Sequence, residues 1–381
     1  MSLHNLLHEV LQRITEKDDT VFTADVKEQK EFLERLDEPK DDIQRSYNQY
    51  LCQMRLIRNP FVKCLMNLAS LPLIVVYLFK KKDKPIRIDN YDGVFFADGK
   101  PDTILPKSLT FGKKIITITN KSSYRDKELI SLLKGMAKQH PFSWQFILKN
   151  LIKLEYFSFV IHAYTPRYIV SCNEYSFTSS ILTLYCERMG IKHYNVMHGE
   201  KLYYIRDSFF RFDKCYVWDE YYCNLFKQLR AEKNQFEVQI PPSLIINGQR
   251  KPEVDFTYYL GDEPDADLER ISDYLLLLRG KNHTVRVRPH PRYSKDDSIV
   301  IFRKKGIPVE DTKTIDIKHS LLSTKHAIAL YSTVLNQAIN NGIGTVIDDM
   351  TNRQKFDKLK SLKYRFADDD RVEKLSDIIS I

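Results

Sequence analysis

Between His283 and Asp349 the chain reads HTVRVRPHPRYSKDDSIVIFRKKGIPVEDTKTIDIKHSLLSTKHAIALYSTVLNQAINNGIGTVIDD. Val and Arg alternate over 284–288, which is the two-residue period of a half-buried strand. A strand of buried type, HAIALY, follows at 326–331, and VLNQAINNG at 334–342 has helical spacing. Strands that alternate with helices in this way predict a doubly wound parallel sheet.

The same alternation occurs twice along the chain. In the first series we expect strands at 93–97, 114–119, 167–172, 192–197 and 214–218, and helices at 125–139, 143–163, 177–189 and 219–231. In the second series we expect strands at 255–260, 284–288, 307–309, 326–331 and 344–348, and helices at 266–279, 296–305, 315–324, 333–341 and 352–361. The segment between the series, 240–253, holds three prolines and a glycine and is the best candidate for a linker.

The length of the chain, 381 residues, exceeds what one ordinary core holds, so we expect more than one domain. The predicted fold class is α/β, with two Rossmann-like domains that face a cleft and an N-terminal helical arm. We place the arm at 1–60, an N-terminal acceptor domain at 61–245 and a C-terminal nucleotide-binding domain at 246–381. The arm is rich in helix formers with apolar residues on one face, so helices that cover the first domain are its simplest interpretation.

The composition narrows the functional classes. A net charge of +9 favours an anionic partner, but the charge is spread along the chain without a nucleic-acid motif, so we expect no nucleic acid. The six cysteines form no C-x-x-C pair, which indicates free thiols in a reducing cytoplasm rather than a zinc site. Neither G-x-G-x-x-G nor G-x-x-x-x-G-K-[ST] occurs, which argues against a dinucleotide enzyme and a P-loop NTPase.

The most apolar run of the chain is FVKCLMNLASLPLIVVYLF at 61–79, which Lys80–Lys82 follow. Lys63, Asn67 and Pro72 inside it argue against a spanning helix. We expect either a buried helix and strand of the first domain or an amphipathic segment that lies on an anionic membrane. The second interpretation predicts a cytoplasmic protein held peripherally on the inner face of the plasma membrane.

A histidine between two prolines follows the Val-Arg strand, in the run Arg288, Pro289, His290, Pro291 and Arg292. A residue so placed does not lie inside a helix or a paired central strand, so His290 is expected at the carboxyl end of a strand, where α/β sheets bind ligands. There Arg288, Pro291 and Arg292 would frame a phosphate, and His290 could give it a proton. The alternative is a capped turn on a basic surface, because a His-Pro pair alone is a weak signal.

Further polar residues follow other predicted strands. Ser332 and Thr333 open a helix, with Asn336 one turn on, and either bind a phosphate at the helix N-terminus or simply cap it. Asp262 and Glu263 form either a general base at a strand end or a solvated acidic helix start.

In the first series, His198, Gly199 and Glu200 close one strand, and Glu174 follows another. Gly199 permits a tight turn that exposes its neighbours, so His198 or Glu200 could contact a substrate, either the donor or the acceptor of a transferred group. Glu174 is a further candidate base. A strand-end loop without chemistry is the alternative at both places.

Three of these pairs occur in a fixed order: Asp262-Glu263, His290-Pro291 and Ser332-Thr333. From about residue 165 to 361 the chain resembles bacterial GT-B glycosyltransferases of surface-polysaccharide synthesis, and among them the sialyltransferases and polysialyltransferases. That family shares an acidic Asp/Glu-Asp/Glu-Gly motif, a His-Pro motif and a Ser or Ser-Ser/Thr motif in the same order. Pro264 stands where the family has glycine. The element around His198 resembles one in capsule and teichoic-acid transferases.

The resemblance implies a GT-B fold and an inverting reaction onto a surface glycan, with CMP-linked sialic acid or a related keto-sugar acid as donor. Asp262 or Glu263 would deprotonate the acceptor hydroxyl, His290 would stabilise or protonate the departing phosphate, and Ser332 and Thr333 would bind that phosphate or the carboxylate of the sugar. We expect neither a metal nor another cofactor, because cations on Arg and His can replace Mg²⁺ at the leaving group.

Two other functions stay open. One is a GT-B transferase with a different donor: a UDP- or GDP-sugar, CMP-Kdo or a CDP-polyol phosphate. The other is a non-catalytic polysaccharide-assembly protein that keeps the fold. Assembly of the chain into a homodimer is a further possibility that the sequence leaves open.

Overall fold

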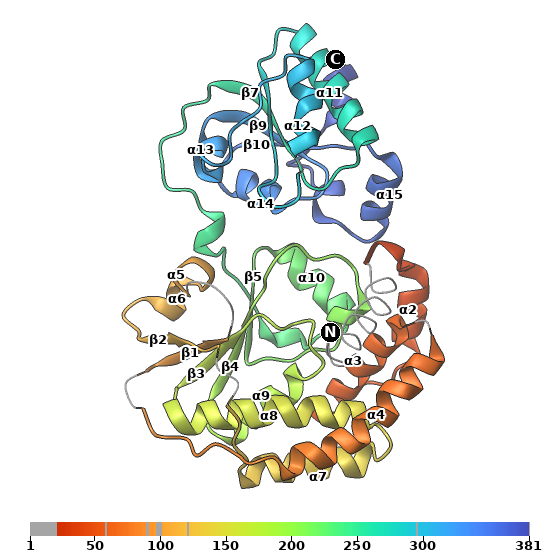
Figure 1. Cartoon of the computed structure of the whole chain (residues 1–381), viewed down its shortest axis with the longest axis vertical. Coiled ribbons are helices and arrows are strands. Elements are labelled where there is room, and N and C mark those ends of the chain that lie inside the picture. Colours follow the sequence, from red (N-terminus) through yellow and green to blue (C-terminus); the bar gives the residue numbers. More distant parts are fainter. Residues whose placement is uncertain are drawn as a thin grey trace. The chain divides into compact units, whose positions relative to one another are not determined.

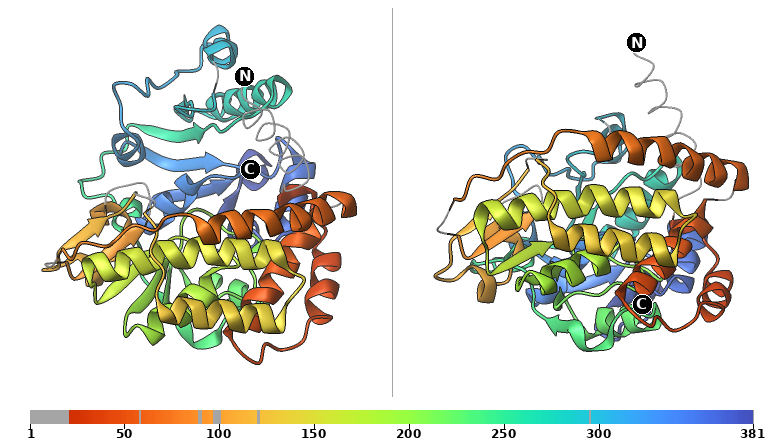
Figure 2. Two further views of the ribbon diagram at one scale, coloured as in Figure 1. Left: turned by 60° about the horizontal axis from the view of Figure 1, so that its bottom comes forward. Right: turned by 90° about the horizontal axis from the view of Figure 1, so that it is seen from below.

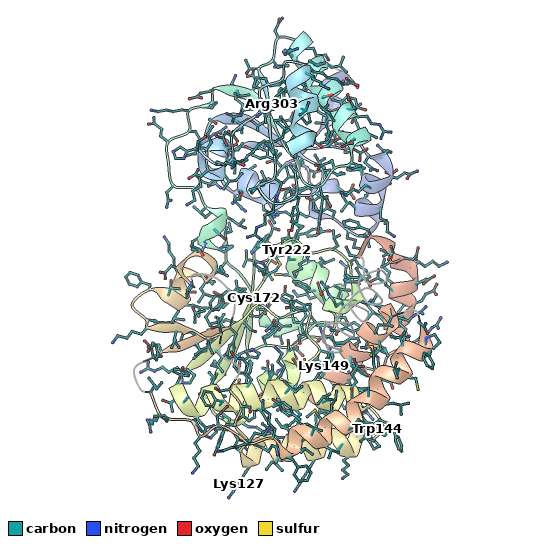
Figure 3. All side chains as sticks on the ribbon, in the orientation of Figure 1. Lys127, Trp144, Lys149, Cys172, Tyr222 and Arg303 are labelled. Atoms are coloured by element: carbon teal, nitrogen blue, oxygen red, sulfur yellow. The ribbon has the colours of Figure 1, made fainter. Side chains whose placement is uncertain are left out.

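A computed structural model of the chain describes residues 21–57, 59–88, 91–96, 101–119, 122–294 and 296–380 (Figure 1). These residues divide into two compact units, and side chains fill the interior of each (Figure 3). The first unit comprises the described residues up to His198 together with Tyr203–Pro241. The second comprises Gly199–Leu202 and the chain from Pro242 onward.

The first unit is built on a parallel sheet, in the order β2-β1-β3-β4-β5-β6 within the described ranges. Its strands are β1 Gly93–Phe96, β2 Ile115–Thr117, β3 Tyr168–Ser171, β4 Lys192–Val196, β5 Lys214–Val217 and β6 Phe236–Val238. β1 pairs with β2 on one side and with β3 on the other, so the direction of winding reverses between β1 and β3. This reversal makes the sheet doubly wound.

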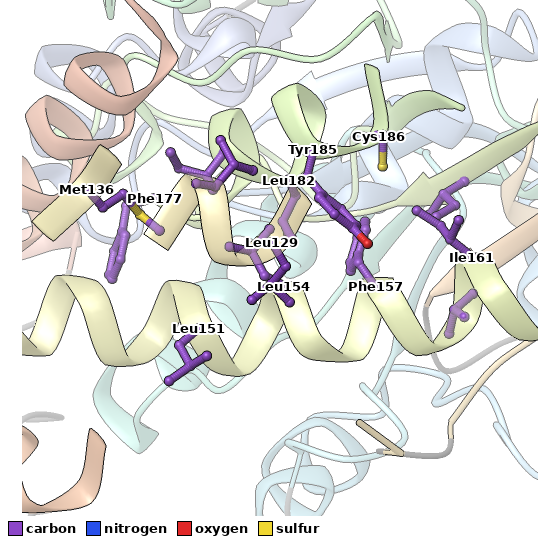
Figure 4. Close-up of a cluster of buried hydrophobic side chains, with 14 of the residues drawn as sticks. Leu129, Met136, Leu151, Leu154, Phe157, Ile161, Phe177, Leu182, Tyr185 and Cys186 are labelled. Carbon is purple, nitrogen blue, oxygen red and sulfur yellow. The ribbon is translucent and has the colours of Figure 1, made fainter. Parts of the chain in front are cut away.

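Helices cover this sheet and join its strands. They are α2 Val26–Glu34, α3 Asp42–Leu56, α4 Pro60–Phe79, α5 Pro101–Ile104, α6 Lys107–Thr110, α7 Lys127–Gln139, α8 Trp144–Tyr164, α9 Ser179–Arg188 and α10 Glu220–Gln228. α4 and α7 both pack against α8, and the three helices run side by side (Figure 2). The largest hydrophobic core of this unit lies where α7, α8 and α9 meet, around Leu129, Leu154 and Tyr185 (Figure 4).

The second unit holds a parallel sheet in the order β11-β10-β9-β7-β8, counting the described residues. Its strands are β7 Val254–Tyr259, β8 Val285–Arg288, β9 Thr324–Ala329, β10 Gly344–Ile347 and β11 Glu373–Lys374. Its helices are α11 Asp265–Gly280, α12 Asp296–Lys304, α13 Ile317–Leu322, α14 Thr333–Asn340, α15 Arg353–Ser361 and α16 Leu375–Ser380. Since β7 pairs with β8 on one side and β9 on the other, the winding reverses between β7 and β9.

The predicted α/β class with two Rossmann-like domains is confirmed by these two parallel sheets. Two local predictions are wrong, and two short segments of regular structure were not predicted. Residues 60–79 form one continuous helix, with Pro72 inside it, rather than a helix and a strand. The expected strand at 307–309 is reduced to a single parallel bridge from Val287 to Val309. Short elements at 236–238 and 373–380 were not expected, since they are too brief to show a period.

The two arginines of β8 explain how the 309–315 segment is held beside the sheet. Val285 and Val287 enter the hydrophobic core on one face, so Arg286 and Arg288 point to the other. Both guanidinium groups pair with the fully buried carboxylate of Glu310, at 3.2 Å for Arg286 and 2.5 Å for Arg288. Arg288 also donates to the backbone carbonyl of Ile315 at 3.0 Å. One carboxylate thus forms ion pairs with two arginines.

Glu310→Ala should therefore lower the free energy of unfolding by about 3–5 kcal/mol, because it leaves two arginines without their shared partner in a region of low solvent access. Chemical denaturation followed by circular dichroism measures the loss. The matched control is Asp273→Ala, which removes an exposed carboxylate paired with Lys305 and should cost about 0–1 kcal/mol. Equal losses for the two variants would contradict the structural role given to Glu310.

Candidate functional site

Three of the predicted motifs lie at one edge of the second sheet. β7 lies between β8 and β9, and all three strands are parallel, so the loops that follow them leave the sheet on the same side. These loops carry the acidic pair, the His-Pro turn and the Ser-Thr pair, in that order. Neighbouring strands are about 4.8 Å apart, so the ends of β8 and β9 are separated by about 10 Å. This edge includes the point where the winding reverses, which is where doubly wound sheets bind ligands.

A pocket of about 290 Å³ opens between the first two of these loops. It is lined by Gly261, Asp262, Glu263, Pro264, Asp265, Leu268, Tyr293 and Ser294. All of these residues belong to the second unit. The structure therefore brings the predicted acidic pair next to the turn that contains His290.

Glu263 has the more enclosed carboxylate of the pair, whereas Asp262 is exposed. Its Oε2 accepts a hydrogen bond of 2.7 Å from the backbone N–H of Gly261, which fixes the side chain against its own loop. Burial raises the pKa of Glu263, and the negative charge of Asp262 adds to the rise. A carboxyl group whose pKa is shifted upward by burial in a pocket is a candidate general base or acid.

His290 is held in one tautomer by the turn around it. Its Nδ1 accepts hydrogen bonds from the backbone N–H groups of Arg292, at 3.0 Å, and Tyr293, at 3.3 Å. Nδ1 is thus an acceptor, so Nε2 carries the proton of the neutral ring. The ring also stacks on Tyr293, with 4.4 Å between centroids. Burial and the charge of Arg292 lower the pKa of His290, while Asp262 raises it.

Ser294 links the His-Pro turn to the acidic loop. Its Oγ accepts from the backbone N–H of His290 at 2.8 Å and donates to the carbonyl of Gly261 at 3.2 Å. Gly261 in turn donates to Glu263. The two loops therefore form one hydrogen-bonded unit around the pocket. Sequence reasoning missed Gly261, Tyr293 and Ser294, although a serine four residues after a His-Pro pair is a recognisable turn residue.

Ser332 is the N-cap of α14, and its Oγ accepts from the backbone N–H of Val334 at 3.2 Å. Thr333, the first residue of the helix, is exposed. Asn336 does not lie on that surface. It is fully buried, its Nδ2 donates to the carboxylate of Glu200, and its Oδ1 accepts from Arg365 at 3.1 Å. The contact of Arg365 with Asn336 could not be predicted from the sequence, because Arg365 lies outside any periodic pattern.

Of the other residues predicted to frame a phosphate, Arg288 is buried, whereas Pro291 and Arg292 are exposed. Arg288 is buried against Glu310, so its guanidinium is engaged beneath the sheet edge rather than in the pocket. Pro291 and Arg292 are exposed in the turn. The donor contact predicted for Arg288 would require this ion pair to break, whereas Arg292 can reach a ligand without such a change.

The predicted residues that follow β3 and β4 are not among those that line the pocket. Glu174 belongs to the first unit and is fully buried, where its Oε2 accepts from Asn195 Nδ2 at 3.0 Å. His198 is exposed at the end of β4. Gly199 has a φ of +73°, which is costly for any other residue, so the tight turn expected there is present. Catalytic roles for Glu174 and His198 stay predictions.

Within the described ranges, no group of three or more His, Cys, Asp or Glu residues is placed to hold a metal ion. The pocket is lined by the carboxylates of Asp262, Glu263 and Asp265, and the imidazole of His290 in the adjoining turn has its Nδ1 occupied by backbone N–H groups.

The chain matches no protein-family model and no curated protein. Solved structures similar to it include the UDP-N-acetylglucosamine 2-epimerase of Rickettsia bellii (TM-score 0.40, 10% identity, covering 68% of this chain and 79% of that one). The lipopolysaccharide outer core galactosyltransferase WaaB (0.38, 10%, 69% and 81%) and the wall teichoic acid polymerase TagF (0.41, 12%, 84% and 88%) are similar too. Similarities this weak do not show what this chain does, so its function is inferred from its own residues.

The geometry of His290 predicts a large effect of its removal. With a donor that the protein uses, His290→Ala should lower kcat about 10²–10³-fold, because a charge-stabilising donor to the leaving group is lost. His290→Asn should be as slow, since an amide oxygen can replace Nδ1 as acceptor but nothing replaces Nε2. His140→Ala, at the other His-Pro pair, is the control for kcat. Steady-state kinetics measures these effects, with circular dichroism as a check that each variant is folded. A normal kcat for His290→Asn would refute the role of Nε2.

The raised pKa of Glu263 predicts the acidic limb of the pH profile. A base acts only when deprotonated, so kcat/KM should fall as the pH drops through a value above that of an ordinary glutamate. Glu263→Gln should abolish activity. Asp262→Asn should retain it and move the limb to lower pH, because a charge that raises the pKa is removed. Loss of activity in Asp262→Asn with an active Glu263→Gln would assign the base to Asp262 instead.

Proposed function

We propose that this protein is a glycosyltransferase that moves a sugar from a nucleotide-sugar donor to a hydroxyl group of a glycan acceptor. The proposal is carried by one observation, the pocket at the carboxyl edge of the second sheet. There a carboxylate with a raised pKa and a histidine of fixed tautomer come from two loops that Ser294 joins. Together they supply a base for the attacking hydroxyl and a hydrogen-bond donor for the leaving oxygen in a transfer between oxygen atoms.

The proposed reaction is a single displacement. Glu263 takes the proton of the acceptor hydroxyl, whose oxygen forms a bond to the anomeric carbon. The bond from that carbon to the phosphate oxygen breaks on the opposite face, so the configuration inverts. Nε2 of His290 donates a hydrogen bond to the departing phosphate oxygen and stabilises the negative charge that it gains, while Nδ1 keeps its two backbone N–H donors. The proton of the acceptor ends on Glu263 and the phosphate leaves as the anion. The numbers of protons and charges balance without a further reactant.

The phosphate of the donor is proposed to bind between the His-Pro turn and the start of α14. Ser332 and Thr333 stand at that helix N-terminus, where N–H groups and the helix dipole favour an anion. The separation of about 10 Å between the ends of β8 and β9 suits a nucleotide that crosses β7. Arg292 would carry positive charge near the leaving group and His290 would add a hydrogen-bond donor, and we propose on this basis that the reaction needs no metal.

For the donor we propose a CMP-linked sialic acid or a related keto-sugar acid. Support comes from the order of the acidic, His-Pro and Ser-Thr motifs, and from their position on three neighbouring strands. The proposed acceptor is a glycan of the bacterial surface. A surplus of positive charge on the chain agrees with an anionic donor but does not select among nucleotides.

A nucleotide panel tests the proposal. We expect CMP to raise the melting temperature and UDP and GDP to leave it unchanged, because a ligand stabilises the state that binds it. Ser332→Ala should reduce the CMP shift, and His140→Ala should keep it. Transfer from the matching CMP-sugar should then persist in excess EDTA.

The other outcomes each exclude part of the proposal. A shift with UDP or GDP alone would assign a different donor. Activity lost in EDTA and restored by Mg²⁺ would overturn metal independence. No shift with any of the three nucleotides, and no transfer, would favour a non-catalytic assembly protein.

A further inference from the structure

α4 has an unusual surface for a helix on the outside of a soluble protein. Its exposed large apolar residues are Phe61, Leu65, Leu68, Leu71, Leu73, Val75, Val76, Leu78 and Phe79. Phe61, Val76 and Phe79 are 73%, 67% and 86% exposed, so most of the surface of each residue is in contact with solvent. A surface helix normally has charged and polar residues on its outer face. Continuous apolar surface of this extent indicates contact with something other than water.

The opposite face of α4 already has its partner within the first unit. Ser70 is the one buried residue of the helix, and Ile74 and Tyr77 pack against the core around α8. These positions follow the spacing of a single packed stripe. The exposed residues are therefore not needed for the fold, and no described part of the chain covers them.

The helix is long and apolar enough to cross a membrane, with only 11% of its apolar window buried. Contacts along its length nevertheless tie it to the unit. Near its start, Asn67 donates to the carbonyl of Phe142 at 2.8 Å and accepts from the backbone N–H of Gln145 at 3.1 Å. At its end, Arg125 donates to the carbonyl of Leu78 at 3.2 Å. A spanning position would break these contacts, whereas a helix lying in the membrane plane keeps them all.

The charges around α4 favour an anionic lipid surface over a protein partner. Residues 60–82 contain no Asp or Glu. Lys80, Lys81 and Lys84 are exposed directly after the helix with one acidic residue, Asp83, among them, so the charge beside this end of the apolar face is positive on balance. Lysine stems can lie along an apolar surface while their ammonium groups reach phosphate headgroups. An apolar helix face bordered by lysines is the pattern of helices that bind in the plane of anionic membranes.

We propose that α4 is a monotopic membrane-binding helix, seated in the interface of an anionic bilayer with its Phe61–Phe79 apolar face toward the acyl chains. A 20-residue helix is about 30 Å long, so the whole strip lies in the plane and Lys80 and Lys81 reach the headgroups at one end. Phe142, whose backbone carbonyl accepts the hydrogen bond from Asn67, also has an exposed side chain. This inference rests on the first unit alone and does not depend on the reaction proposed above.

Vesicle flotation of the full chain tests the proposal. We expect binding to phosphatidylcholine vesicles that contain phosphatidylglycerol, weaker binding to phosphatidylcholine alone, and release by salt. Leu68→Glu should weaken binding about 10- to 100-fold, the effect of removing a leucine from the acyl region. The matched control is Leu277→Glu on α11, because Leu277 and Leu68 are exposed to 51% and 53%. Lys80→Gln should reduce only the part of the binding that depends on anionic lipid.

The depth of the helix is measured separately. In Val76→Trp, lipids brominated near the headgroup should quench the new tryptophan more than lipids brominated at the chain ends. Stronger quenching at the chain ends would indicate a spanning helix and overturn the proposal. Failure of the wild-type chain to bind either vesicle would do so as well, and so would equal losses for Leu68→Glu and Leu277→Glu. A dimer in light scattering that Leu68→Glu converts to a monomer, without vesicle binding, would assign the face to a second copy.

Discussion

The pairing of β7 with a parallel neighbour on each side is the constraint on which the second unit depends. It buries β7 at the centre of the sheet and forces the loops after β7, β8 and β9 to leave at one edge. Residues about 28 and 70 positions apart, such as Asp262, His290 and Ser332, are brought together only because of this register. Without parallel pairing the acidic loop and the His-Pro turn would lie at opposite ends of the sheet.

The elements that could be predicted from the sequence are those whose pattern reflects burial. The second halves of β7 and β9 are buried, because both faces of a central parallel strand are covered there, and the long helices show their apolar face every three or four residues. The fold class follows from the order of such elements. Asp262, Glu263 and His290 could also be located, since residues at the carboxyl ends of predicted parallel strands share an edge whatever the details of packing.

What could not be predicted depends on contacts between residues far apart in the chain. Arg288 looked like a ligand for phosphate, but its partner Glu310 lies in a segment with no periodic signal. Asn336 looked like part of a helix N-terminus, but it is one turn too far along and is buried against Arg365. The apolar run of α4 suggested burial, and only the packing of one stripe on α8 shows that the other side is open.

The hydrogen bonds of Ser294 connect the two loops of the pocket energetically as well as geometrically. A ligand that orders the turn of His290 also acts on Gly261, and through Gly261 on the carboxylate of Glu263. Where binding at one loop changes the arrangement of the other, thermodynamic linkage makes the effect on affinity equal in both directions. Donor and acceptor would thus bind cooperatively, with a single serine hydroxyl as the route of coupling between them.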